Sequence, residues 1–321
     1  MRKSNTDVTL LTPDFVRMCL SNGLLFASVY MVLLSPYMSM RLYLLFAVGM
    51  LAVGPFHAYL GDAYKRKHVY LWSVLGLMAC AAGYGWVTDS AGRMLLSFLQ
   101  GASFGLATTA GITLSIDITT SERRTEANVQ YALAGRVGML AGIAGALWTG
   151  DVWLPMQTLY LSLAVGLLSL LLAARVYVAF RAPIGVGWIS ADRFFLPRAW
   201  LPALNVWLRL FPVGVFLPLM FAPQWRVAGL VVIAFLVLQT ALSWTGLFIN
   251  LSQHCQRGTA NTTCCLSIDL GILSGLALCY GCLASGTSLV ALLVGALSAA
   301  VLSLLLYLSV TRPYYRKHRV R

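Results

Sequence analysis

The sequence predicts an all-α polytopic membrane protein with about ten transmembrane helices. Its 321 residues are 59% hydrophobic and 10% charged, and the mean hydropathy is +0.79. A soluble domain carries about 25% charged residues, whereas a spanning helix needs about 20 mostly apolar residues. Ten apolar segments follow one another along the chain, near residues 15–38, 42–61, 69–88, 93–116, 127–149, 153–179, 199–221, 227–249, 262–284 and 288–310.

Basic residues are distributed unequally between the two sides of these segments. Placing the N-terminus in the cytoplasm puts 17 of the 23 Lys and Arg residues inside and only Arg41, Arg93 and Arg226 outside. This is the positive-inside pattern of membrane proteins. The net charge of +13 therefore sets topology and contacts the headgroups of the lipid bilayer, and we expect no nucleic-acid partner. Both termini are predicted to be cytoplasmic.

Sequence patterns of enzymes and metal sites are not found. The phosphate-binding pattern G-x-x-x-x-G-K-S/T does not occur, so ATP-driven transport by this chain is not expected. No Ser-His-Asp or two-carboxylate constellation is visible at membrane depth. Cys279 and Cys282 lie in an apolar segment without a flanking His or carboxylate. We expect no enzymatic activity, no cofactor and no metal.

A short polar sequence occurs twice, each time at the start of an apolar segment. The first copy is Arg124–Asn128 and the second is Arg257–Asn261, 133 positions later. At the same offset Gly138 falls on Gly271, and both lie in the segment that follows. Two polar loops that each lead into a glycine-bearing membrane helix indicate a duplicated helical bundle.

The two copies differ in length. From the first helix near Phe15 to Arg124 is 109 residues, but from Ala199 to Arg257 is only 58. The missing stretch of about 51 residues corresponds to two membrane helices with their loops. We therefore predict a six-plus-four arrangement: a six-helix N-terminal bundle at 1–180, a cytoplasmic linker at 181–198, and a four-helix C-terminal bundle with a basic tail at 199–321.

The loop between the second and third segments, GPFHAYLGDAYKRK, places a glycine, an aspartate and a basic run in order. It resembles the signature loop of the major facilitator superfamily, with alanine and lysine at two positions where that family usually has a basic residue and a glycine. In the family this loop is a conformational latch. The resemblance assigns that role to Gly54, Asp62, Arg66 and Lys67.

The fifth segment carries Gly138, Gly142 and Gly145, which resemble the glycine-rich motif of the family's antiporter branch. Close helix packing is an equally good explanation of such glycines. The resemblance covers nearly the whole chain and implies a bacterial inner-membrane secondary transporter, shortened by two helices. It would move a small organic solute by alternating access, coupled to protons, with export favoured over uptake.

Two other interpretations follow from the missing helices. The shortened chain could be a non-transporting remnant that serves as a sensor or assembly partner. Alternatively, a homodimer would let a second chain supply the missing wall.

Three charged residues, Arg136, Arg209 and Asp269, are each predicted near the middle of an apolar segment. A charge there costs about 2.5–3.5 kcal/mol unless it is paired or hydrated. With two arginines and one aspartate, one arginine is left for an anionic or amphipathic solute, and Asp269 is the group that titrates. A static Arg–Asp bridge between the halves is the alternative. Polar residues expected to line the same cavity are Asn22, His57, Gln100, Asn205 and Gln239.

Overall fold

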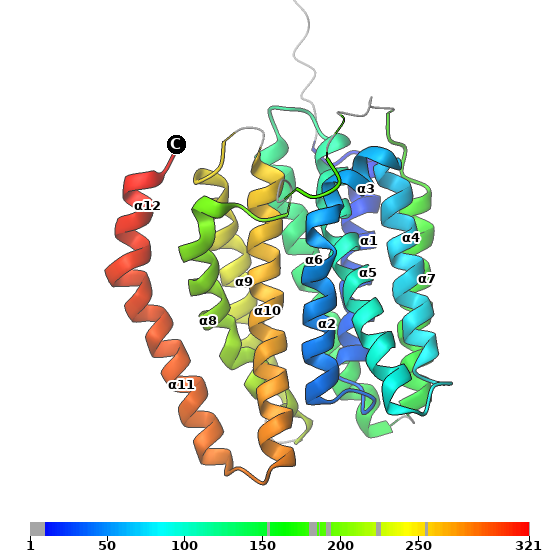
Figure 1. The fold of residues 1–321 in the computed structure, drawn as a ribbon, viewed down its shortest axis with the longest axis vertical. Coiled ribbons are helices and arrows are strands. Elements are labelled where there is room, and N and C mark those ends of the chain that lie inside the picture. Colours follow the sequence, from blue (N-terminus) through cyan, green and yellow to red (C-terminus); the bar gives the residue numbers. More distant parts are fainter. Residues whose placement is uncertain are drawn as a thin grey trace, which may run out of the picture.

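The computed structural model describes residues 10–152, 155–179, 185, 187–190, 194–222, 226–253 and 256–320. Much of the predicted linker lies outside these ranges. Every regular element within them is a helix (Figure 1). In chain order they are α1 (Pro13–Leu33), α2 (Met40–Ala52), η1 (Gly54–Phe56), α3 (His57–Ala63), α4 (Arg66–Gly83), α5 (Ser90–Asp117), α6 (Arg124–Val152), α7 (Pro155–Ala174), η2 (Pro197–Ala199), α8 (Trp200–Phe216), η3 (Leu217–Phe221), α9 (Arg226–Asn250), α10 (Arg257–Ala284), α11 (Leu289–Leu306), η6 (Tyr307–Thr311) and α12 (Arg312–His318).

Nine spans in the described part of the chain are long and apolar enough to cross a membrane. α4 covers the remaining predicted segment and packs against α5 and α7. Its first three residues, Arg66, Lys67 and His68, are polar and lower its mean hydropathy. The predicted fold class, an all-α polytopic membrane protein, is confirmed.

The second predicted segment is not one continuous α-helix. α2 ends at Ala52, a 3-10 turn covers Gly54–Phe56, and α3 then begins at His57. Pro55 causes the break because it has no N–H to donate to the preceding turn and its ring crowds the carbonyl there. Hydropathy alone detects the apolar run and not this interruption.

The two repeated sequences were expected in loops, but the structure places them in helices. Arg124 and Arg257 are the first residues of α6 and α10. Several of their polar side chains form hydrogen bonds across the contact between these two helices. Asn261 donates from Nδ2 to the backbone oxygen of Asn128 at 3.2 Å, and Arg257 donates to Oγ1 of Thr125 at 3.0 Å. Polar first turns can therefore be helical, because they face each other and not lipid.

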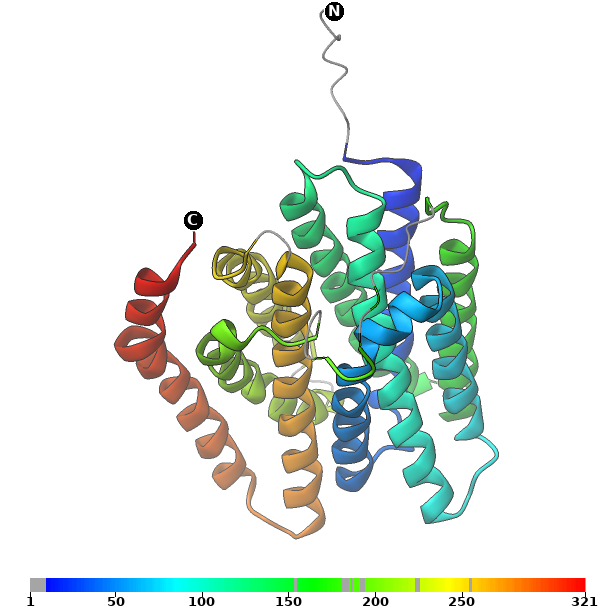
Figure 2. The ribbon, with the colours of Figure 1, turned by 45° about the horizontal axis from the view of Figure 1, so that its top comes forward.

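The helices form two groups that lie side by side (Figures 1 and 2). In the first half α1 packs against α6 and α7, and α5 packs against α2 and α4. In the second half α8 packs against α10 and α11. The halves are joined by contacts of α10 with α2, α5 and α6, and by the contact of α6 with α9. α11 and α12 form the outer edge of the second half (Figure 2).

Glycines bring α6 against the backbone of α1. A Cβ added at Gly138 would overlap the carbonyl oxygen of Gly23, and one added at Gly142 would overlap that of Ala27. Both positions therefore require glycine for this close approach. Close packing therefore accounts for Gly138 and Gly142, whereas a Cβ at Gly145 would make only ordinary contacts with Met31.

The same contact recurs in the second half between α10 and α8. Gly271 faces the carbonyl oxygen of Trp207 and Gly275 faces that of Phe211. Each contacted residue of α8 stands 184 positions after the residue of α1 contacted in the first half. The repeat thus extends to α1 and α8, where the sequences show little similarity, and this register relates individual residues of the two halves.

We expect Gly138→Ala to lower the free energy of unfolding by about 1–3 kcal/mol, because the new methyl group forces α1 and α6 apart. Gly246→Ala in α9 is the matched control, since no atom lies within 4 Å of a Cβ built there. Alanine favours a helix over glycine by about 1 kcal/mol, so the control should be neutral or stabilising. Denaturant titration in mixed micelles measures both, and equal effects would contradict the close approach.

Candidate substrate and coupling site

A buried ion pair joins the two halves near the middle of their spans. Arg136 lies on α6 and Asp269 on α10, and each is 1% exposed. Nη1 of Arg136 contacts Oδ1 of Asp269, and Nη2 donates to Oδ2 at 3.1 Å and to the backbone oxygen of Cys265 at 3.2 Å. Such a two-pronged geometry is the strong form of an arginine–carboxylate contact.

α1 supplies a further contact to each partner of this ion pair. Tyr30 donates its hydroxyl to Oδ1 of Asp269 at 3.0 Å. Cζ of Arg136 lies 4.9 Å from the centre of the Phe26 ring, where the ring face attracts the cation. Charges taken out of water need such additional partners, because attraction between the ions alone does not repay their desolvation.

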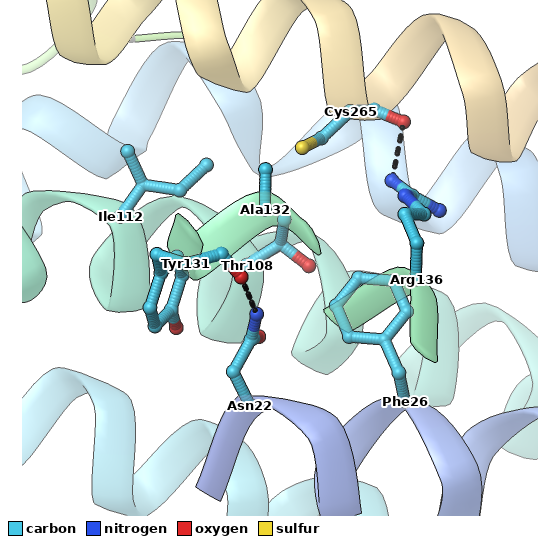
Figure 3. Close-up of a pocket in the computed structure, with 8 residues that line it drawn as sticks. All are labelled: Asn22, Phe26, Thr108, Ile112, Tyr131, Ala132, Arg136 and Cys265. Carbon is cyan, nitrogen blue, oxygen red and sulfur yellow. Dashed lines mark hydrogen bonds between the residues drawn. The ribbon is translucent and has the colours of Figure 1, made fainter. Parts of the chain in front are cut away.

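A small cavity lies beside Arg136 (Figure 3). Its volume is about 10 Å³, room for about one water molecule. Two of its lining oxygens, Oδ1 of Asn22 and Oγ1 of Thr108, are buried without a hydrogen-bond partner, while Nδ2 of Asn22 donates to the backbone oxygen of Tyr131 at 2.9 Å. The cavity is lined by Asn22, Phe26, Thr108, Ile112, Tyr131, Ala132, Arg136 and Cys265.

The halves touch on both sides of the ion pair. Towards the start of α6 and α10, Asn128 contacts Asn261. Towards the other end of α10, the rings of Tyr43 and Tyr280 lie 5.4 Å apart. The cavity beside Arg136 is too small for an organic solute, so this arrangement is closed around the ion pair.

Tyr30→Phe should cost about 1.5–3 kcal/mol of unfolding free energy, the range for a hydrogen bond to a charged group. The ring stays and only the donor to Asp269 is lost. Tyr64→Phe is the control, because Tyr64 is 62% exposed. Thermal unfolding of each purified variant in detergent measures its loss of stability relative to wild type. No difference between the two variants would mean that the Tyr30 hydroxyl does not stabilise the carboxylate.

Of the polar residues expected in the cavity, only Asn22 lines it. Gln100 is buried two turns earlier than Thr108 on α5, and its Oε1 has no hydrogen-bond partner. His57 is buried at the start of α3 and does not line this cavity. Asn205 exchanges hydrogen bonds with Ser303, donating from Nδ2 to its backbone oxygen at 2.9 Å. That contact fastens α8 to α11.

Arg209 and Gln239 were also expected at the site of Arg136, but they meet each other elsewhere. Nη2 of Arg209 donates to Oε1 of Gln239 at 2.6 Å, and Nε donates to Oγ1 of Thr240 at 3.1 Å. These contacts link α8 to α9. Neither residue lines the cavity beside Arg136.

Residues of the predicted latch contact the ends of several helices. Arg66 forms an ion pair with Asp117 at the end of α5. Lys67 donates to two backbone oxygens just after and at the end of α7, those of Val176 and Ala174, at 2.8 and 2.7 Å.

The other two latch residues contact the predicted linker. Asp62 accepts from the backbone N–H of Gly185 at 2.6 Å. Gly54 lies directly against the ring of Phe194, with no room for a side chain. The latch role itself stays a prediction.

Sequence reasoning missed Phe26 and Tyr30. Together with Asn22 they stand four residues apart on α1, so they share one face of that helix. This spacing was a readable signal, although aromatic residues are common in apolar segments and carry no charge that would attract notice.

These features define a polytopic helical membrane protein with a charged pair at the contact between its halves. The sequence profile of the Major Facilitator Superfamily matches residues 16–315. The chain therefore belongs to this superfamily of membrane transporters, as the signature loop predicted. Sequence comparison with curated proteins finds no match.

Two solved structures show the same fold. The human organic anion transporter MFSD10 (TETRAN) aligns at 13% identity with a TM-score of 0.59, covering 94% of this chain and 98% of that one. The superfamily transporter FucP, in the outward conformation, aligns at 12% identity with a TM-score of 0.54, covering 97% and 100%. Such low identities establish fold similarity alone.

Proposed function

We propose that this protein is a secondary active transporter that moves a small organic solute by alternating access and couples that movement to protons. The observation that carries the proposal is the ion pair between Arg136 and Asp269. It is fully buried, it joins the two halves, and both residues lie near the middle of their spans. A charged pair at this depth is costly and is typical of substrate and ion pathways.

The proposed cycle begins when rocking of the halves opens one side and admits water and solute to the pair. An anionic group then replaces the Asp269 carboxylate at Arg136. A carboxylate left without its arginine in a poorly hydrated site takes up a proton, because an unpaired buried charge is far more costly than a neutral acid. Arg136 holds the solute and Asp269 holds the proton.

Unsatisfied polar groups next to Arg136 support the same assignment. Oδ1 of Asn22 and Oγ1 of Thr108 line the cavity and have no hydrogen-bond partner. Buried polar atoms without partners are rare and call for an explanation. In the proposal they bind donor groups of the solute once the cavity widens.

The charge of the solute determines the direction of coupling at this pair. An anion at Arg136 and a proton on Asp269 bind together and therefore move together. A cationic group would instead compete with the proton for Asp269, which is what export against an inward proton gradient requires. Export is the direction implied by the resemblance of the α6 glycines to the antiporter branch.

Exchange of solute across the membrane tests whether the chain transports at all. Proteoliposomes are preloaded with one unlabelled solute and diluted into the same labelled solute, using a panel of aromatic carboxylates, alkyl sulfonates and amphipathic cations. We expect labelled uptake well above that of protein-free liposomes for at least one class. If folded, inserted protein exchanges none of them, a non-transporting role for the shortened chain gains support.

A further inference from the structure

Arg209 is a mid-membrane charge that the proposed transport mechanism does not use. It is the central residue of the span Pro197–Phe221 and is half-buried. Its hydrogen-bond partners, Gln239 and Thr240, are both neutral. Among the residues that the structure describes, no carboxylate lies within ion-pair distance of it.

The internal repeat relates Arg209 to a buried residue of the first half. With the shift of 184 positions, its counterpart in α1 is Leu25, which is 1% exposed. Arg209 is only half-buried, and its side chain reaches across to α9.

Two helices of the first half, α4 and α5, have no counterpart in the described part of the second. In the first half α5 packs against both α1 and α2, and α4 packs against α5 and α7. In the second half α8 and α9 pack directly against each other. Arg209 thus lies on a surface that the described residues leave partly open, whereas its counterpart Leu25 is covered.

The neighbouring surface of α9 is continuous with Arg209. Val231, Phe235 and Leu242 are 64%, 67% and 52% exposed. At 100° per residue they share one face of the helix with Gln239 and Ser243. We call this surface the open flank, comprising Arg209, Val231, Phe235, Gln239, Leu242 and Ser243. On α9 it is apolar at Val231 and Phe235, and it carries polar side chains at Gln239 and Ser243.

A second copy of this chain does not supply the charge that the open flank lacks. The chain has ten Asp and Glu residues, and Asp269 is the one near the middle of a span. That carboxylate is already bound to Arg136. A two-fold contact would instead bring two copies of Arg209 together, where like charges repel.

We propose that the open flank binds a membrane-spanning helix of a partner protein that carries a carboxylate at mid-depth, which pairs with Arg209. A lipid headgroup fits less well, because it lies at the membrane surface, about 15 Å from the middle of a ~30 Å hydrocarbon core. A partner helix covers part of the surface left open, and its carboxylate neutralises the charge of Arg209. The proposal is independent of the transport mechanism, so its failure leaves that mechanism untouched.

Energy transfer between fluorophores in liposomes tests the proposal with synthetic helices. The probe is a labelled Leu/Ala-rich peptide of about 23 residues with one central Asp, and matched peptides carry Asn or Leu at that position. Polar contacts between membrane helices contribute about 0.6–1.7 kcal/mol, so the Asp peptide should associate with the labelled full chain roughly three- to twentyfold more strongly than the Leu peptide. Arg209→Met should remove this preference and Arg209→Lys should keep part of it.

Each other outcome has a definite meaning. Equal association of the Asp and Leu peptides with folded wild-type protein would overturn the proposal. Preference for the Asp peptide that survives in Arg209→Met would also overturn it, since another site would then be responsible. Energy transfer between two differently labelled copies that depends on Arg209 would identify a second copy as the occupant instead.

Discussion

Arg136→Met is expected to lower the free energy of unfolding by about 3–5 kcal/mol, because it leaves the Asp269 carboxylate buried without its countercharge. Methionine keeps most of the side-chain length, so the loss comes mainly from charge and not from a cavity. The measurement is a denaturant titration of the purified protein in mixed micelles, read by helical signal.

The double variant Arg136→Met with Asp269→Leu separates charge from packing. Replacing both members of a buried pair by apolar residues is often neutral or stabilising, so the double variant should recover most of the stability lost in the single one. If the single and double variants are equally unstable, the loss of stability comes from packing around α6 and α10 and not from the ion pair.

Asp269→Asn is expected to abolish proton-driven accumulation of solute while leaving exchange of an anionic solute in place. The amide cannot take up a proton, so an imposed proton gradient cannot drive accumulation of the solute. Arg136 keeps its charge and can still bind an anion. The measurement compares uptake of the labelled solute with and without an inward proton gradient. In the variant the two uptakes should be equal.

Asp14→Asn is the matched control for that experiment. Asp14 pairs with Arg17 at the start of α1 and is partly exposed, so its loss should not change accumulation. Full accumulation by Asp269→Asn would exclude this carboxylate as the coupling group.

Hydropathy and the positive-inside pattern predicted the membrane helices well, because bilayer thickness fixes the length of each apolar segment. What they could not supply was the orientation of side chains around each helix. Asn205 was assigned to the cavity from its depth, but it faces α11 because α8 presents that side to its neighbour. Depth follows from position along the helix, whereas the facing direction depends on where other helices pack.

The choice between two arginines also could not be made from charge arithmetic. One aspartate and two candidate arginines leave both pairings open. The repeat, however, indicates which arginine pairs with Asp269. Arg136 and Asp269 occupy equivalent positions, 133 residues apart, and equivalent positions of α6 and α10 meet where these helices touch. Asn128 and Asn261 meet in the same way. Arg209 has its equivalent at Leu25 and so lies elsewhere.

The most direct test of the account is the internal pH of proteoliposomes during addition of solute, recorded with an enclosed fluorescent dye for wild type beside Asp269→Asn. We predict that a transported anion carries protons inwards and acidifies the interior, and that this signal disappears in the variant. A transported solute that moves no protons in the wild type would contradict the central claim that Asp269 couples transport to protons.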